Sequence, residues 1–368
     1  MQADWFHHQL VEQEFGPFTG VPCSLVKELI IQIEQSEESS YVIATSEGEA
    51  MGLAGGFALA GRLPVVIMQN DGLGNAINPL SSLQLLYDLP ALLIITWRAE
   101  PGTKPDAPQH RIMGETLPEL LELMKIPYAV LEDDELECKR TIAAAKEYLS
   151  QQKRPFALII RRDLFQAEKR SDRGPDPELP LRIDYIKALA GRIDAKDIIL
   201  GTTGYTGREL KQVINRPGTF YTAGSMGCIG SIGLALAREQ PDRKVYVLDG
   251  DGALLMKLGT LATIGLYRPA NLIHIVFDNG QYESTGGQQT ASGTISFPAV
   301  GEHSGYAYAT SVESLAEFEQ FLEQAENRSG PLMCHVRVQP GTLPDLQRPS
   351  QSPEQLRHEF QQFLDAKC

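Results

Sequence analysis

Short apolar runs alternate along the chain with longer segments in which apolar and polar residues are mixed. The short runs are typical of buried parallel strands, and the mixed segments have the length and periodicity of helices. Because such alternation places parallel strands next to one another with helices on both faces of the sheet, it predicts an α/β fold. The predicted strands are Tyr41–Thr45, Val65–Met68, Ala91–Thr96, Phe156–Ile160, Asp197–Leu200, Val245–Leu248 and Leu272–Phe277. The predicted helices are Glu47–Ala60, Leu117–Met124, Glu209–Ile214, Ser231–Arg238, Gly259–Leu266 and Pro353–Asp365.

A charged, proline-rich segment divides this pattern into two halves. Glu168–Pro180 combines several charges with three prolines and one glycine, a composition typical of linkers. We therefore expect a first domain over residues 1–168, a linker over 169–180 and a second domain over 181–368. Each half is long enough for one doubly wound parallel sheet.

The composition excludes several classes of partner and site. The formal net charge of -14 disfavours binding to nucleic acid or to anionic lipid. The five cysteines are odd in number and far apart, which argues against a disulfide framework or a structural zinc site. The first ten residues lack the apolar run of a signal peptide, and no apolar run is long enough to span a bilayer. We expect a soluble, cytoplasmic protein.

Two polar segments follow consecutive predicted strands of the second half. Gly250-Asp251-Gly252 comes after one strand, and Asn279 and Gln281 come after the next. Open α/β sheets bind ligands at the carboxyl ends of their strands, where glycines let the backbone approach a phosphate. One carboxylate, one amide oxygen and one backbone carbonyl would suit Mg²⁺ that also binds phosphate oxygens. Taken alone, Gly250-Asp251-Gly252 could equally be a turn with a solvated aspartate.

The first half carries acidic residues at the start of a helix made largely of small residues. Glu47 and Glu49 open the segment, which continues with many Gly and Ala residues up to Ala58. Such a composition lowers helix stability, so close packing of the helix backbone against another surface would explain it. Acidic residues are also common at helix N-termini for electrostatic reasons alone.

Together these motifs resemble those of the thiamine-diphosphate enzymes. The resemblance implies that Asp251, Asn279 and the carbonyl of Gln281 bind Mg²⁺. It implies that Glu47 binds N1′ of the aminopyrimidine and activates the cofactor; Glu49, two residues further along, is the alternative. The carbonyl of Gly224 and the side chain of Met226 would hold the pyrimidine ring. The remaining residues implied in cofactor binding are Thr203, Gly204, Gly250, Gly252 and Ala253.

The two-domain arrangement, without a central third domain, is similar to that of phosphonopyruvate and sulfopyruvate decarboxylases. The similarity extends over nearly the whole chain and includes Phe18–Leu25, Met68–Pro79, Trp97–Gly102, Pro108–His110 and Glu283–Gln288. It implies decarboxylation of phosphonopyruvate to phosphonoacetaldehyde in phosphonate biosynthesis. It also implies a homo-oligomer with active sites between subunits. Sulfopyruvate decarboxylase, a thiamine-dependent carboligase and a nucleotide-binding regulatory module remain as alternatives.

An anionic substrate requires local positive charge, and this directs attention to the loop after Ala91–Thr96. Arg98 can bind a phosphonate bidentately, and Lys104 can act as a point charge. We expect these two residues, with His110, Asn70 and Asn75, to bind substrate. Lys104 and Arg98 could also be surface charges, His110 a structural loop residue, and the two asparagines turn caps.

One departure from the related decarboxylases concerns the proton donor. Some relatives place an aspartate in the loop that here contains Cys23, and a histidine where this chain has Cys228. A thiol does not replace a carboxylate. The proton donor is therefore left open, and neither cysteine is assigned a catalytic role.

Overall fold

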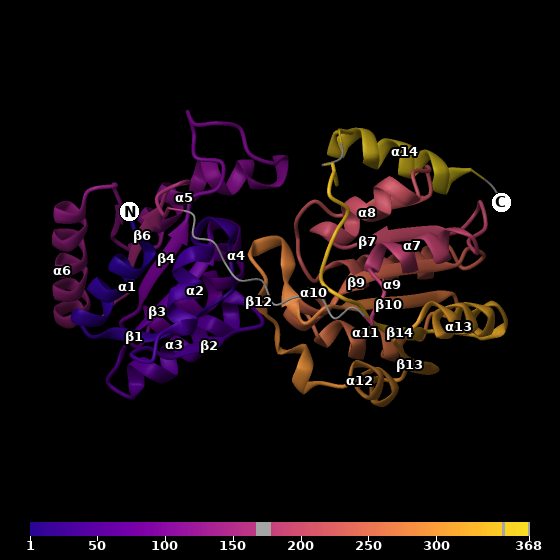
Figure 1. Cartoon of the computed structure of the whole chain (residues 1–368), viewed down its shortest axis with the longest axis horizontal. Coiled ribbons are helices and arrows are strands. Elements are labelled where there is room, and N and C mark those ends of the chain that lie inside the picture. The colour runs from indigo at the N-terminus through magenta and orange to yellow at the C-terminus, as the bar shows by residue number, and fades with distance from the viewer. Residues whose placement is uncertain (167–177, 348–349, 367–368) are drawn as a thin grey trace. The chain divides into compact units, whose positions relative to one another are not determined.

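The computed structural model describes residues 1–166, 178–347 and 350–366, and these form two compact units (Figure 1). Of the described residues, the first unit holds 1–166 and 285–288, and the second holds 178–284, 289–347 and 350–366. The predicted linker, 169–180, lies outside the described residues except for its last three. The proposed domain boundaries therefore stay a prediction.

The first unit is built on a six-stranded sheet in which all strands are parallel, in the order β2-β1-β3-β4-β6-β5. Its strands are β1 (Phe15–Gly20), β2 (Tyr41–Ile43), β3 (Leu63–Gln69), β4 (Leu92–Thr96), β5 (Tyr128–Val130) and β6 (Phe156–Ile160). Its α-helices are α1 (Ala3–Glu12), α2 (Lys27–Gln35), α3 (Glu47–Leu59), α4 (Asn70–Pro79), α5 (Arg111–Leu123) and α6 (Glu135–Gln152).

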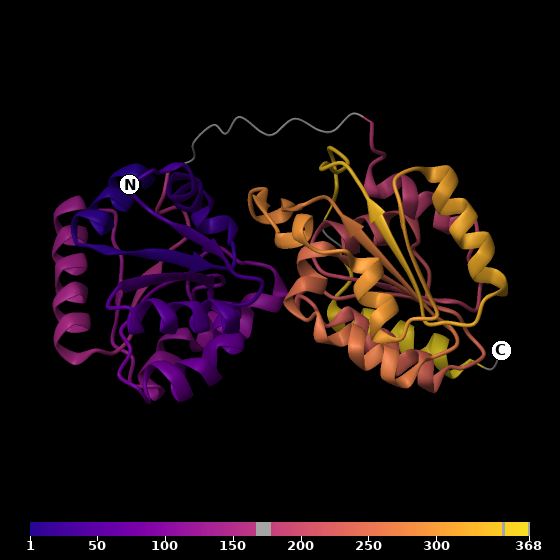
Figure 2. The same ribbon diagram turned by 90° about the horizontal axis from the view of Figure 1, so that it is seen from below.

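Alternate residues of the central strands enter two separate apolar clusters, one on each face of this sheet. In β3, Val65 and Ile67 join the cluster formed with α1, α2 and α6, whereas Val66 and Met68 join the cluster formed with α3, α4 and α5. Successive side chains of a strand point to opposite faces, so a continuous apolar run is what a sheet covered on both faces requires. Figure 2 shows helices on both sides of the strands.

The second unit repeats this architecture with a parallel sheet in the order β13-β14-β10-β9-β7-β8. Its strands are β7 (Ile198–Gly201), β8 (Thr219–Tyr221), β9 (Val245–Gly250), β10 (Leu272–Asp278), β13 (Tyr308–Val312) and β14 (Leu332–Arg337). Two short strands, β11 (Gln281–Tyr282) and β12 (Gln288–Gln289), pair separately. The α-helices are α7 (Arg182–Ala190), α8 (Tyr205–Val213), α9 (Ile229–Glu239), α10 (Asp251–Met256), α11 (Gly259–Tyr267), α12 (Phe297–Ser304), α13 (Leu315–Asn327) and α14 (Pro353–Asp365).

The predicted α/β class and parallel sheets are confirmed. Each predicted strand overlaps an observed one, and Phe156–Ile160 and the final helix Pro353–Asp365 have the predicted bounds. No helix of the described residues is long and apolar enough to cross a lipid bilayer.

Candidate active site

Glu47 is the first residue of α3, and its side chain is buried although it is a carboxylate (6% exposed). Asn75 Nδ2 donates a hydrogen bond of 2.8 Å to Glu47 Oε2. Helix α4 passes so close that a Cβ added to Gly72 would lie 2.3 Å from Glu47 Oε1. Glycine at position 72 is therefore what allows α4 to cover this carboxylate.

Glu49 has a different role in the same helix. Its Oε2 accepts hydrogen bonds from Thr45 N (2.7 Å) and Thr45 Oγ1 (2.6 Å), and the side chain is exposed. Ser46 caps the helix by accepting a hydrogen bond from Glu49 N. Glu49 thus stabilises the start of α3, whereas Glu47 is the acid that points into the protein.

The start of α4 also holds the loop that follows β4. Asn70 is fully buried; its Nδ2 donates to Arg98 O (3.0 Å), and its Oδ1 accepts from Arg98 N (3.2 Å). Asn70 is therefore bound to protein backbone through both ends of its amide. Asn70 therefore links the start of α4 to the loop after β4, whereas Asn75 is bound to Glu47.

His110 is buried, and its Nδ1 lies 2.8 Å from Asp71 Oδ2, which also accepts from Gln69 Nε2 (2.6 Å). Cys23 lies beside this group, with its Sγ 3.1 Å from Thr96 Oγ1 and 3.5 Å from Gln69 Oε1. Burial raises the pKa of the Cys23 thiol above its ordinary value, despite the opposing hydrogen bond from Thr96. Cys23 is therefore a neutral thiol.

Arg98 forms a bidentate ion pair with Asp106: Nε to Oδ2 is 2.6 Å and NH2 to Oδ1 is 2.8 Å. Burial alone would lower the pKa of Arg98, but the hydrogen bonds and charge of Asp106 outweigh burial and raise it. Lys104 is exposed. The loop thus presents Arg98 in a fixed position and Lys104 on the surface.

In the second unit, the predicted cofactor residues lie at the carboxyl ends of three neighbouring strands. Thr203 and Gly204 follow β7, Gly224 and Met226 follow β8, and Gly250–Ala253 follow β9. Thr203 Oγ1 donates to Ala223 O (2.8 Å), which joins the first two of these loops. The order in which strands are added to the sheet reverses at β7, because β8 lies on one side of β7 and β9 on the other. Such switch points are the usual ligand sites of open α/β sheets.

Asp251 begins α10 and is buried (5% exposed), with Thr290 Oγ1 donating to its Oδ2 at 2.6 Å. Burial and the nearby carboxylate of Asp278 raise the pKa of Asp251. Asp278 is itself held charged, because hydrogen bonds from His335 and Ser292 lower its pKa against the opposing effect of burial. Two buried carboxylates in such proximity favour a nearby cation.

Asn279 follows β10, and hydrogen bonds at both the nitrogen and the oxygen of its side-chain amide fix its orientation. Nδ2 donates to Glu283 Oε2 (3.0 Å), while Oδ1 accepts from Gln281 N (3.1 Å). Glu283 Oε1 in turn accepts from Gly341 N (2.6 Å), which fixes the carboxylate. The structure thus places Asn279 and Gln281 in one tight turn at the carboxyl end of the strand beside the one that precedes Asp251.

These residues fit a magnesium diphosphate. The predicted ligands are all oxygens, which Mg²⁺ prefers, and include one carboxylate. Thr202 Oγ1 is buried at the end of β7 and lacks a hydrogen-bond partner among the described residues, as a hydroxyl facing a phosphate would. Within the described ranges there is no group of three or more His, Cys, Asp and Glu suited to a metal. The predicted magnesium ligands are one carboxylate, one side-chain amide and one backbone carbonyl, so they would not form such a group.

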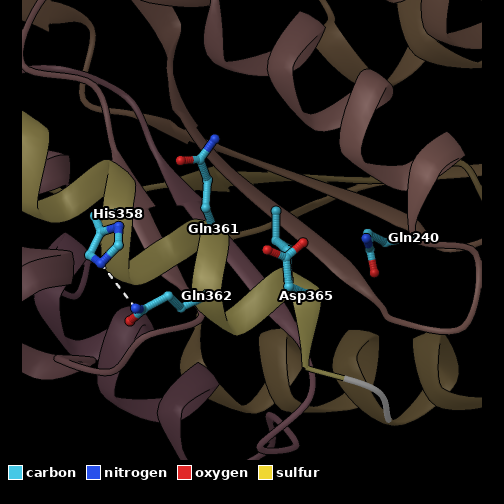
Figure 3. A pocket seen from close by; sticks show the side chains of 6 residues that line it. Gln240, His358, Gln361, Gln362 and Asp365 are labelled. Carbon is cyan, nitrogen blue, oxygen red and sulfur yellow. Dashed lines mark hydrogen bonds between the residues drawn. The ribbon is translucent and has the colours of Figure 1, made fainter.

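A surface pocket of about 440 Å³ lies along α14, away from these residues in sequence (Figure 3). Its one hydrogen bond drawn in the figure joins Gln362 Nε2 and His358 Nε2 at 2.9 Å. The lining residues are Gln240, His358, Gln361, Gln362, Leu364 and Asp365. None of them was predicted as a site residue.

Both units match models of the same enzyme family. Residues 2–117 match the N-terminal TPP binding domain of thiamine pyrophosphate enzymes, and residues 202–336 match the C-terminal TPP binding domain. A phosphonopyruvate decarboxylase of Streptomyces viridochromogenes is 35% identical over 94% of this chain and 90% of its own length. The chain belongs to the phosphonopyruvate and sulfopyruvate decarboxylase family of thiamine-pyrophosphate enzymes.

Other members and a solved structure are more distant. A sulfopyruvate decarboxylase of Methanosarcina acetivorans is 30% identical to this chain, over 94% of this chain and 93% of its own length. The crystal structure of a benzoylformate decarboxylase from Polynucleobacter necessarius has 13% identity and a TM-score of 0.40, covering 94% of this chain and all of that one.

Several contacts of the site were not predicted. Sequence reasoning missed Asp71 beside His110, Asp106 beside Arg98, Glu283 beside Asn279, and Thr290 beside Asp251. Asp71 lies within a segment that carried the family resemblance, and Glu283 lies at the start of another. The resemblance marked these segments as important without indicating which side chains meet.

Proposed function

We propose that this decarboxylase converts phosphonopyruvate to phosphonoacetaldehyde and CO2, with thiamine diphosphate and Mg²⁺, in phosphonate biosynthesis. The observation that carries the proposal is the 35% identity, over almost the full length of both chains, to a phosphonopyruvate decarboxylase. The bidentate pair of Arg98 and Asp106 supports it, because a rigidly held guanidinium suits an anionic substrate.

In this proposal the second unit holds the diphosphate end of the cofactor. Asp251, the Asn279 side chain and the Gln281 carbonyl bind Mg²⁺. The loops after β7 and β9, with Thr203, Gly204, Gly250, Gly252 and Ala253, surround the phosphates. The carbonyl of Gly224 and the side chain of Met226 hold the pyrimidine ring.

The first unit supplies the acid. The buried Glu47 binds the pyrimidine nitrogen, and Asn75 holds the carboxylate in one orientation. The chemistry that thiamine diphosphate supplies when bound is an acceptor for the electron pair left behind as CO2 departs. Arg98 and Lys104 bind the anionic group of the substrate, and His110, fixed by Asp71, lies at the same edge of the sheet.

We also propose that the protein is a cytoplasmic homo-oligomer whose active sites lie between subunits. Large apolar side chains on the surface of the first unit support an association surface, among them Leu59 (75% exposed), Leu86 (64%) and Tyr87 (66%). The four described cysteines are free thiols, which is in keeping with a reducing compartment.

The test is CO2 release from phosphonopyruvate, sulfopyruvate and pyruvate, measured side by side with thiamine diphosphate and Mg²⁺. We expect the highest kcat/KM for phosphonopyruvate. The 30% identity to a sulfopyruvate decarboxylase makes sulfopyruvate the second candidate, and a higher kcat/KM for that acid would replace the proposal. Absence of CO2 release from all three acids would refute the decarboxylase assignment of the site.

A further inference from the structure

Two arginines of the first unit share one buried carboxylate. Arg98 follows β4 and Arg162 follows β6, and these strands are neighbours in the sheet. Asp106 Oδ2 accepts from Arg98 Nε (2.6 Å) and from Arg162 NH2 (2.5 Å), and the Asp106 side chain is only 2% exposed. Both guanidinium groups therefore reach one and the same carboxylate oxygen.

The cluster carries a net positive charge. Burial alone would raise the pKa of Asp106, but the hydrogen bonds of Arg98 and Ala107 N and the charge of Arg98 outweigh burial and lower it well below its usual range. Asp106 is thus ionised, and two arginines against one aspartate leave one positive charge, in a chain whose net charge is -14. The bridging carboxylate offsets the repulsion that would otherwise separate the guanidinium groups.

Hydrogen-bond donors remain available in the cluster. Arg98 NH1 also faces Ser24 Oγ at 3.4 Å. A guanidinium carries several N–H donors, and two such groups have more of them than Asp106 and Ser24 can accept. The Arg162 side chain is 36% exposed and that of Arg98 12%, so a ligand can reach both.

Two further groups lie near Arg98, and one of them is charged: the Asp71 carboxylate, like Asp106, helps to raise the pKa of Arg98. The Asp71 carboxylate is bound by His110 and Gln69. Cys23, which precedes Ser24, is a neutral thiol. The N–H donors of the arginine pair that Asp106 and Ser24 do not use are the groups through which an anion would bind here.

One helix connects the cluster to Glu47. Asn70, at the start of α4, binds the backbone of Arg98 on both sides, while Gly72 and Asn75 of the same helix lie against the Glu47 carboxylate. The arginine pair and the acid are thus held by a single rigid element at the carboxyl edge of one sheet.

We propose that Arg162, together with Arg98 and with Asp106 as the bridge between them, forms the subsite for the phosphonate or sulfonate group of the substrate. The inference rests on the proposed function and deepens it, because it assigns specificity for 2-oxo acids with a second anionic group to Arg162. A tetrahedral anion with three oxygens can accept from both guanidinium groups at once.

The neighbouring Arg161 provides a matched control. It pairs with Glu100 (2.8 Å) and Glu132 (2.6 Å) instead of Asp106, and its side chain is 39% exposed. We would compare the wild-type protein with Arg162→Ala, Arg162→Lys and Arg161→Ala. Two properties would be measured: kcat/KM for phosphonopyruvate and sulfopyruvate, and the Kd of methylphosphonate from a 31P NMR titration. Thermal unfolding and thiamine-diphosphate binding would verify that each variant is folded.

Loss of a charge-assisted hydrogen bond predicts that Arg162→Ala lowers kcat/KM for the substrate by about 10- to 100-fold and weakens methylphosphonate binding by a similar factor. Arg162→Lys should recover part of the loss, and Arg161→Ala should change both values by less than about twofold, since exposed ion pairs contribute little.

Equal effects of Arg162→Ala and Arg161→Ala on methylphosphonate binding would overturn the inference. A wild-type protein that releases CO2 from none of the acids would instead refute the proposed function. The NMR titration would then still decide, without turnover, whether Arg162 belongs to an anion site.

Discussion

Glu283 Oε2 accepts a hydrogen bond from Asn279 Nδ2 at 3.0 Å and lies 3.4 Å from Arg182 NH1. The carboxylate therefore determines which end of the Asn279 amide faces away from it, and that end is the oxygen. If Asn279 binds Mg²⁺ through this oxygen, Glu283 is the residue that positions it, without contact to the metal itself.

We therefore predict that Glu283→Ala weakens Mg²⁺-dependent retention of thiamine diphosphate by about 10- to 100-fold, the usual effect of removing a partner of a metal ligand. The measurement is a Mg²⁺ titration followed by the cofactor that remains bound after gel filtration. Glu302→Ala, which removes an exposed acid of α12 in the same unit, is the control and should leave the titration unchanged. An unaltered Mg²⁺ requirement in Glu283→Ala would contradict the positioning role.

The two glutamates at the start of α3 can be compared in the same way, with Glu47 as the proposed catalytic acid and Glu49 as its control. Glu47→Gln should keep the cofactor but lose turnover by about 100- to 10,000-fold, the range of a lost acid–base group. Glu49→Gln should retain turnover, because the exposed Glu49 carboxylate accepts from the preceding Thr45 at the start of the helix. Steady-state kinetics and cofactor binding separate the two effects. If Glu49→Gln were the inactive variant, the two assignments would have to be exchanged.

The sequence predicted those parts of the molecule that leave a continuous local pattern. The apolar runs of β3, β4, β6, β9 and β10 were found because buried strands of a parallel sheet contain few polar residues. β1 was missed because Phe15–Gly20 contains two glycines and a proline, which resemble a loop. β14 was missed because its run is interrupted by His335, whose polarity is compensated by Asp278 and Ser311.

Pairwise contacts of the site were beyond the reach of sequence patterns. Glu47 and Asn75 are 28 residues apart, and Arg98 and Arg162 meet at Asp106 only because β4 and β6 are neighbours, with β5 at the edge. The order of strands determines such contacts, and a chain with these apolar runs could in principle arrange them in several orders. The resemblance to a family drew attention to Glu47, Asp251 and Asn279 as candidates, whereas the contacts of Asp106, Arg162 and Glu283 are found only in the structure.

A buried ion pair predicts a pH-dependent loss of stability. Arg182 Nε lies 2.7 Å from Glu209 Oε2, and the Glu209 side chain is fully buried. Arg182→Met would remove the arginine that pairs with Glu209. It should lower the free energy of unfolding by about 3–5 kcal/mol at neutral pH. Burial already raises the pKa of Glu209, despite Arg182, and loss of the arginine raises it further. A protonated Glu209 carries no charge, so the loss in Arg182→Met should shrink as the pH falls.

Urea unfolding at pH 5 and pH 7 measures this effect. The double variant Arg182→Met/Glu209→Leu should recover most of the stability, because the Glu209 charge is gone and Glu283, the other partner of Arg182, still accepts from Asn279 and Gly341. Arg192→Met removes a partly exposed arginine that pairs with Glu323 and should cost less than about 1 kcal/mol. A loss in Arg182→Met that is the same at both pH values would show that Glu209 does not take up the proton.

The last prediction concerns the thiols. Burial raises the pKa values of Cys23 and Cys334, and burial with the charge of Glu135 raises that of Cys138 to about 12. Only the thiolate reacts with iodoacetamide, so these three cysteines should stay unmodified in the folded protein. Cys228 is partly exposed, directly after the loop proposed to hold the pyrimidine ring, and should be modified.

The cofactor should slow this modification. If thiamine diphosphate binds at the loop of Gly224 and Met226, it covers Cys228, and about ten times its Kd of free cofactor with Mg²⁺ should reduce the rate about tenfold. Peptide mapping by mass spectrometry follows Cys228 separately from Cys368, which lies outside the described residues. Asp251→Ala serves as the control, because without Mg²⁺-dependent binding the same cofactor concentration should give no protection. Equal rates with and without cofactor in the native protein would place the pyrimidine ring elsewhere, whereas protection that persists in Asp251→Ala would contradict the metal assignment.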